Sequence, residues 1–221
     1  MALSARQYFD EALHLWGGLV PGIRLEEPTT RGKLLSLASY LQMAVTNAQE
    51  PFPEANARLS FVLLLLEENK RAEANAKTAI WSRPYSFWAR LTLFWLAVMK
   101  LANHNPYSDF SNVAGAAITL GLVAAKSEKA AAVRKSAREV AQAFIETVKS
   151  DFLAGNDIDV RSYLEMGEIL LGIADRLRQN QMREDLLYRV ILQVPWESTN
   201  LGTYEREVSD LRIRAEGLLH V

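Results

Sequence analysis

Residues Pro53 to Pro84 read PEANARLSFVLLLLEENKRAEANAKTAIWSRP, and this stretch decides the fold class of the chain. It holds two runs of helix length, Glu54 to Glu67 and Lys70 to Trp81, which are joined at Glu68 and Asn69. Small residues recur in both runs, and a proline, which cannot continue a helix, follows the second. Because two helices approach closely only where side chains are small, we predict an antiparallel helical hairpin.

The rest of the chain shows the same helical periodicity and no convincing alternating strand. We therefore expect an all-α fold of about ten antiparallel helices, arranged in hairpins as an irregular array or a compact bundle. The predicted domains are an N-terminal helix with a Gly/Pro loop (residues 1–29), a helical-hairpin domain (30–195) and a C-terminal capping helix (196–221). The expected helices are Ser4 to Trp16, Thr30 to Ala48, Glu54 to Glu67, Lys70 to Trp81, Phe87 to Leu101, Ser111 to Ala125, Ser127 to Val148, Asp159 to Gln179, Gln181 to Val194 and Tyr204 to Leu219.

The first hairpin resembles the tetratricopeptide repeat, a helical unit of about 34 residues. Positions of this family at the right spacing are held by Leu59, Ser60, Ala72, Ala79 and Pro84. The family's aromatic positions are held instead by Asn56, Leu63 and Ala76. The match is therefore to the small-residue skeleton of the repeat, and it implies a scaffold that binds other proteins.

A second resemblance covers roughly residues 35 to 160. The segments EENKRAEANAKTAIWSRPYSFWARLTLFW, NVAGAAITLGLVAA and FLAGNDID, in this order, look like an uncharacterised family of bacterial helical proteins that tends to be encoded near type VI secretion genes. This resemblance implies a bacterial origin and a secretion-associated adaptor role, and it transfers no site residue.

Composition excludes several classes of protein. The 221 residues include 25 basic and 26 acidic ones, so no overall field attracts a phosphate backbone or an anionic membrane. The absence of cysteine excludes disulfides and thiolate chemistry. The N-terminus has a helical pattern with acidic residues, so we expect no secretory signal and place the protein in the cytoplasm. Charges within the apolar Phe87 to Ala102 stretch argue against a membrane span.

The search for catalytic and ligand-binding motifs is negative. The three histidines, His14, His104 and His220, are far apart and lack ligand spacing, so we expect no metal site. No glycine-rich phosphate loop is present, and we expect no cofactor. Asp157 and Asp159 are better explained as helix caps than as cation ligands. Glu165 and Glu168 share a helix face, which leaves an enzyme of unrecognised type as an alternative.

The strongest functional candidate is the concentration of aromatic residues from Trp81 to Trp95. Tryptophan and tyrosine dominate the hot spots of protein interfaces. The pattern favours core packing, because Trp88 and Trp95 lie on one face of a helix that is apolar over much of its circumference. The alternative is a partner-binding groove for an amphipathic helix, for which we predict Phe61, Leu65, Trp88 and Trp95 as the lining residues.

Two further surfaces complete the sequence-based predictions. The first is a basic cluster that leaves a helical nucleic-acid-binding subunit as an alternative, although Glu128 and Glu139 interrupt it. The second is a narrow apolar seam in the last helix, which either caps the preceding hairpin or forms a homodimer. The cluster is Lys126, Lys129, Arg134, Lys135 and Arg138, and the seam is Leu201, Tyr204, Val208, Leu211, Ala215 and Leu218. From all this we expect a non-catalytic protein interaction module, an adaptor or chaperone.

Overall fold

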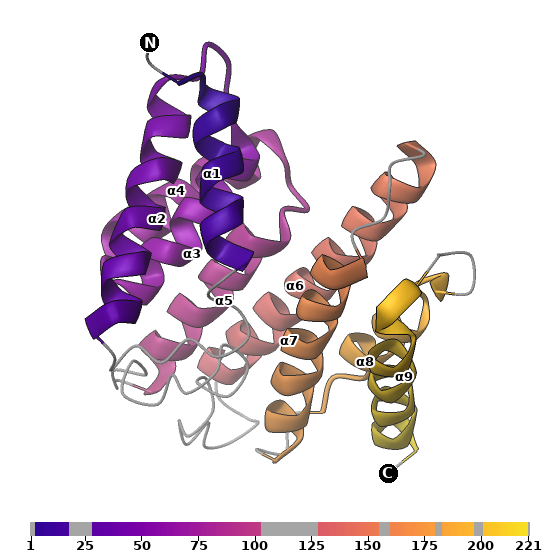
Figure 1. Ribbon diagram of the computed structural model, residues 1–221. Helices are drawn as coiled ribbons and strands as arrows, with labels where there is room; N and C mark the ends of the chain where they lie inside the picture. Colours follow the sequence, from indigo (N-terminus) through magenta and orange to yellow (C-terminus); the bar gives the residue numbers. More distant parts are fainter. Residues whose placement is uncertain are drawn as a thin grey trace.

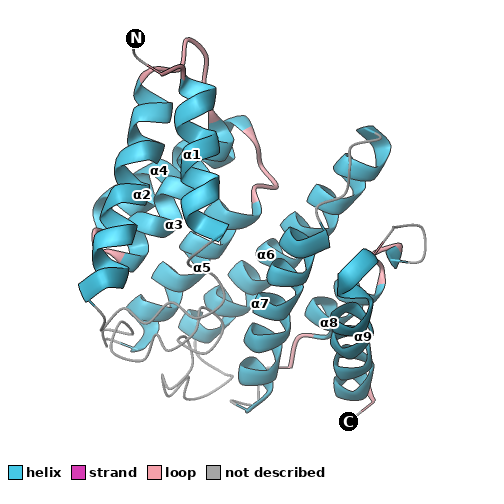
Figure 2. Cartoon of the chain, in the orientation of Figure 1, coloured by secondary structure: helices cyan, strands magenta, loops and turns pink. Residues whose placement is uncertain are grey.

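The computed structural model describes residues 3–17, 28–102, 128–154, 160–179, 183–196 and 201–220. Within these ranges the backbone forms nine α-helices and no strand, which confirms the predicted all-α class (Figures 1 and 2). A tenth predicted helix, Ser111 to Ala125, lies outside the described residues. The helices are α1 (Ala5–Gly17), α2 (Pro28–Thr46), α3 (Pro53–Leu65), α4 (Asn69–Ser82), α5 (Phe87–Ala102), α6 (Glu128–Ala154), α7 (Val160–Gln179), α8 (Asp185–Leu192) and α9 (Glu205–Leu219).

The helices are stacked in the order of the sequence. In the described chain, the main contacts join helices that are next to each other, or next but one, in the sequence. The α1–α4 group and α9 therefore lie at opposite ends of the molecule, with α5, α6 and α7 between them (Figure 1). This arrangement is an irregular array of helices, in which each helix buries its apolar face against its neighbours in the chain.

The turn between α3 and α4 explains why the chain reverses at Glu67. This residue has a φ of 66°, in the left-handed region. The amide of Glu67 donates to the carbonyl of Leu64 at 3.0 Å, and the amide of Glu68 donates to the carbonyl of Leu63 at 2.9 Å. These two bonds form a Schellman motif, which satisfies the last carbonyls of α3 and ends the helix.

Small side chains allow α3 and α4 to pack closely. Ala72, Ala76 and Ala79 form the buried face of α4. The α3 helix contacts α2, α4 and α5, so it is buried on nearly all sides from Ala55 to Leu65. On its α5 side, the hydroxyl of Ser60 lies 3.0 Å from that of Thr92, and both residues are fully buried. The small-residue skeleton recognised in the sequence therefore lies where helices meet.

The last helix covers the end of the array. The α9 helix packs on α7 and α8, and Val208, Leu211 and Ala215 of its apolar seam are buried there. Leu211 packs so closely on α7 that a Cβ at Gly167 would lie 2.7 Å from its Cδ2. At the C-terminal end of α9, the Arg183 guanidinium donates to the carbonyl of Leu219 at 2.7 Å, which satisfies a terminal acceptor. Half of the seam, Val208, Leu211 and Ala215, is thus occupied by contacts within the chain, as the capping interpretation predicts.

Candidate functional site

The aromatic residues between Trp81 and Trp95 differ in exposure: some are buried in the structure and others are exposed. The four predicted partner-binding residues, Phe61, Leu65, Trp88 and Trp95, have exposed fractions of 0, 2, 5 and 1%. Phe61, Leu65 and Trp95 are core residues in this conformation, whereas Trp88, although nearly buried, contributes to the lining of the cleft described below. The four residues therefore do not form the predicted groove together, and the core interpretation is favoured. In contrast, Trp81 is 90% exposed and Tyr85 is 51% exposed.

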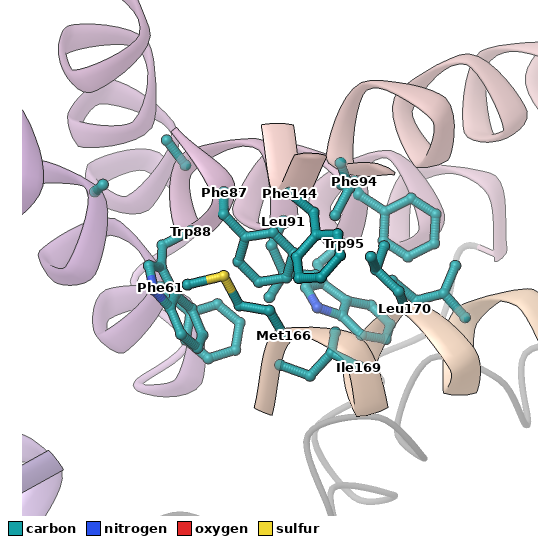
Figure 3. Close-up of a cluster of buried hydrophobic side chains, with 14 of the residues drawn as sticks. Phe61, Phe87, Trp88, Leu91, Phe94, Trp95, Phe144, Met166, Ile169 and Leu170 are labelled. Carbon is teal, nitrogen blue, oxygen red and sulfur yellow. The ribbon is translucent and has the colours of Figure 1, made fainter. Parts of the chain in front are cut away.

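The buried aromatic residues of α5 pack against α1 and α3 at one end of the helix and against α7 further along it. Trp88 of α5 lies with its ring centroid 5.3 Å from that of Phe61 in α3 and 5.1 Å from that of Trp16 in α1. Figure 3 shows Trp95, which lies about two turns further along the same face of α5, beside Ile169 and Leu170 of α7. Edge-to-face contacts of this kind stabilise a core beyond the area that they bury. The α5 helix is therefore the central packing element of the described chain.

A cleft of about 570 Å³ lies between the N-terminal helices and α6. Its volume falls in the range of known ligand pockets, about 300 to 1,000 Å³. Apolar side chains contribute to its lining, among them Phe9 and Leu13 of α1, Trp88 of α5 and Met166 of α7. The remaining lining is mostly charged or polar, and it falls into two walls that differ in charge.

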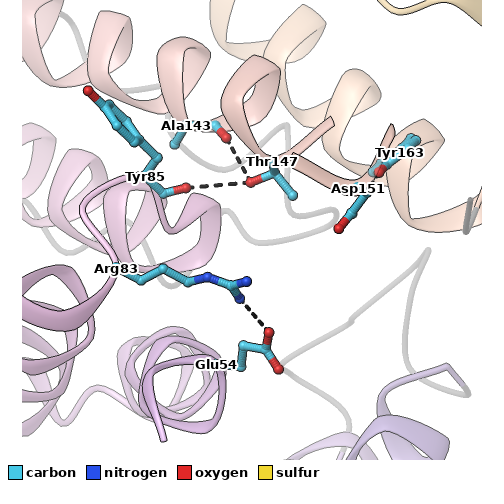
Figure 4. A network of polar contacts seen from close by, with 7 residues as sticks. All are labelled: Glu54, Arg83, Tyr85, Ala143, Thr147, Asp151 and Tyr163. Carbon is cyan, nitrogen blue, oxygen red and sulfur yellow. Dashed lines mark hydrogen bonds and ion pairs between the residues drawn. The ribbon is translucent and has the colours of Figure 1, made fainter. Parts of the chain in front are cut away.

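The first wall carries the arginines of the cleft. Arg6 comes from α1, Arg58 from α3, and Arg83 from the connection between α4 and α5. The Arg58 guanidinium lies 4.2 Å from the centroid of the Trp88 ring, at the distance of a cation–π interaction. Arg83 forms an ion pair with Glu54, the single acidic residue among the described residues of this wall (Figure 4). We call this surface the arginine wall.

The second wall is one face of α6. Glu146, Thr147, Ser150 and Asp151 line the cleft at helical spacing, and no lysine or arginine of the described α6 residues joins them. Asp151 accepts a hydrogen bond of 2.7 Å from the hydroxyl of Tyr163. The Glu146 carboxylate lies 3.4 Å from the ammonium of Lys149, which does not line the cleft. We call this surface the acidic wall.

The segment from Trp81 to Tyr85 runs from the last turn of α4 to the side of the cleft, and we call it the rim. Arg83, Pro84 and Tyr85 line the cleft, whereas Trp81 precedes them in α4 and does not line it. All five residues are exposed, and three of them are tryptophan, arginine and tyrosine, the residue types most enriched in interface hot spots. Hydrogen bonds to Pro84 and Tyr85 nevertheless fix the backbone of the rim. Arg90 donates to the carbonyl of Pro84 at 2.9 Å, and the hydroxyl of Thr147 lies 3.5 Å from the carbonyl of Tyr85 (Figure 4). An aromatic residue on a fixed rim loses little conformational freedom when it binds a partner.

One member of the basic cluster of α6, Arg138, is already paired with a carboxylate. Arg138 donates two hydrogen bonds, of 2.7 and 2.9 Å, to the buried carboxylate of Glu184. The hydrogen bond to Glu184 and the charge of that residue raise the pKa of the Arg138 guanidinium. Lys126 lies outside the described residues. Arg138 therefore acts in joining α6 to the start of α8, and it is not available to follow a phosphate backbone.

Glu165 and Glu168, the two carboxylates on one helix face that could act as an acid and a base, do not point into a common site. Glu165 accepts a hydrogen bond of 3.3 Å from the indole of Trp16 in α1, whereas Glu168 pairs with Arg214 in α9. They therefore serve contacts with different helices and do not flank one reacting atom. Asp157 and Asp159 lie outside the described residues.

Among the described residues, no group of three or more histidine, aspartate or glutamate side chains is arranged to hold a metal ion. The described helices also include none with the length and apolar character needed to cross a bilayer. Comparison with known proteins gives no match to a family model, a curated protein or a solved structure.

Proposed function

We propose that this protein is a non-catalytic interaction module, an adaptor or chaperone, that binds a protein partner at the cleft and its rim. The observation that supports this most strongly is the exposure of Trp81, because a tryptophan that is 90% exposed contributes little to the stability of its own chain. In the sequence it lies close to Arg83 and Tyr85, which line the cleft, and tryptophan, arginine and tyrosine are the residue types most enriched in interface hot spots.

The resemblances found in the sequence extend this proposal. Tetratricopeptide-like hairpins are scaffolds for binding polypeptides, and the second family suggests a cytoplasmic bacterial adaptor associated with a secretion system. Partners are therefore best sought among the proteins encoded close to the gene for this chain. Each can be purified and titrated with the full-length protein.

The test compares two exposed apolar residues of similar exposure. Trp81→Ala removes the rim tryptophan, and Leu153→Ala removes a side chain that is 89% exposed on α6 and does not line the cleft. Loss of a hot-spot side chain costs about 2 kcal/mol or more. We expect Trp81→Ala to raise the partner Kd at least about 30-fold, and Leu153→Ala to leave it within about twofold.

The melting temperatures of both variants serve as controls, and neither should change by more than about 2 °C. Equal effects of the two substitutions on the Kd would place the binding site elsewhere. An unchanged Kd in both variants would also reject the rim as the site.

A further inference from the structure

The outer face of α2 is exposed and carries no charge. The helix packs on α1 and α3 with a face of buried aliphatic residues, and its other side lies at the edge of the molecule (Figure 1). The sequence from Leu34 to Gln49 contains no lysine, arginine, aspartate or glutamate. A helix face that meets only water usually carries charges, as α1 does at Arg6, Asp10 and Glu11. We call the exposed surface the α2 face; its residues lie within about 100° of the helix circumference and are Gly32, Leu35, Ser36, Ser39, Met43 and Thr46.

The α2 face has the properties of a helix–helix contact. Leu35 is 52% exposed and Met43 is 40% exposed, so burial of both side chains would be favourable. The hydroxyl of Ser36 donates to the carbonyl of Gly32 at 3.1 Å, so it needs no water partner. A Cβ at Gly32 would meet no atom of the described chain within 4 Å. The serines between the two large side chains would allow a second helix to approach closely.

The pattern on the α2 face is symmetric about Ser39. Leu35 precedes this residue by four positions, and Met43 follows it by four. When two copies of α2 pack antiparallel around a two-fold axis at Ser39, Leu35 of each copy therefore faces Met43 of the other. Closed two-fold contacts of this kind, in which one surface meets itself, are the commonest in homo-oligomers.

The charges at the two ends of α2 fit the same arrangement. Arg31 and Lys33 lie near its start, and Glu50 follows its last residue by four positions. None of these three side chains forms an ion pair with another described residue. In an antiparallel pair the basic end of one copy lies beside the acidic end of the other, whereas a parallel pair would place like charges together. The apolar and the charged residues thus both favour an antiparallel second copy.

We propose that the α2 face binds the α2 face of a second copy of this chain, which gives an antiparallel dimer with two-fold symmetry. No described residue of α2 lines the cleft, so the dimer would leave two clefts open and goes beyond the proposed function. A contact between two single helices is small, so we expect the dimer to be weak, with a Kd on the order of 10 μM.

Sedimentation equilibrium of the full-length protein tests the dimer. At about 100 μM, well above the expected Kd, the measured mass should approach twice the 24.8 kDa of the chain. Ser39→Arg places two cations at the symmetry axis and should raise the dimer Kd at least about tenfold. The matched control is Ser209→Arg, at an exposed position of α9, which should leave the Kd within about twofold. Thermal unfolding of both variants verifies that they are folded.

Disulfide crosslinking tests the position of the axis. The chain contains no cysteine, so an introduced one is the single thiol of each copy. Under mild oxidation Ser39→Cys should form a covalent dimer, because its two copies meet at the axis. Leu35→Cys should not, because its two copies lie about 12 Å apart along the helix and a disulfide joins Cα atoms up to about 7 Å apart. A mixture of Leu35→Cys and Met43→Cys should crosslink again.

The inference fails if the measured mass is that of a single chain at every concentration up to about 200 μM. It also fails if Ser39→Arg and Ser209→Arg change the dimer Kd equally, because the contact would then lie elsewhere. Crosslinking of Leu35→Cys as efficient as that of Ser39→Cys would reject the antiparallel arrangement.

Discussion

At the scale of single residues, the five tryptophans fall into two groups, because four are buried in the core and one is exposed. All five lie in the described residues, and Trp16, Trp88, Trp95 and Trp196 have exposed fractions of 5% or less. Burial of so large a side chain stabilises the fold by several kcal/mol, on the order of 3 to 5 kcal/mol when judged by truncation to alanine. Trp81 contributes no such packing, which is why its exposure requires another explanation.

The exposure of Trp81 can be measured by fluorescence quenching. We expect iodide to quench the emission of one tryptophan and Trp81→Phe to remove nearly all of the quenchable emission. Quenching that persists in Trp81→Phe would show that a second tryptophan is accessible, contrary to the structure.

At the scale of the element, the α3–α4 hairpin is stabilised by its end motif as well as by its small residues. Glu67 has a left-handed backbone conformation, which costs a non-glycine residue about 1 kcal/mol. Glu68, the next residue, has a φ of −85°, outside the left-handed region that favours glycine. The same substitution should therefore have opposite effects at these two neighbouring positions.

We expect Glu67→Gly to increase the free energy of unfolding by up to about 1 kcal/mol, because glycine adopts the left-handed conformation without steric cost. Glu68→Gly should decrease it by about 0.5 to 1 kcal/mol, because it adds freedom to the unfolded chain and removes the ion pair with Arg71. Chemical denaturation measures both values. A loss of stability in Glu67→Gly would contradict the assigned turn.

Local patterns are sufficient to predict the helices and the outer face of α4. Periodicity and small residues place the hairpin correctly, and the described helices lie within the predicted segments or a few residues beyond them. The exposure of Trp81 was also accessible from the sequence. The buried alanines of α4 end with Ala79, and a residue two positions later in a helix points about 200° away. A helical projection of α4 would therefore have placed Trp81 on the outer face.

At the scale of the whole molecule, the cleft depends on contacts that no local pattern encodes. Its charged residues come from α1, α3, the α4–α5 connection and α6, so Glu54 and Asp151 meet across almost 100 positions of sequence. Each belongs to a helix surface that looks like an ordinary solvated face in the sequence. Only the stacking of the array brings these surfaces together, so local sequence patterns do not predict the cleft.

The most direct test of the binding surface is site-specific photo-crosslinking in the cells that produce the protein, with benzoylphenylalanine placed at Trp81, Tyr85, Leu153 or Ile213 in turn. All four side chains are at least half exposed, but only Tyr85 lines the cleft, and Trp81 lies on its rim. We predict that one partner protein is crosslinked from positions 81 and 85 and not from positions 153 and 213. Crosslinks to that partner from 153 or 213, with none from 81 and 85, would contradict the account.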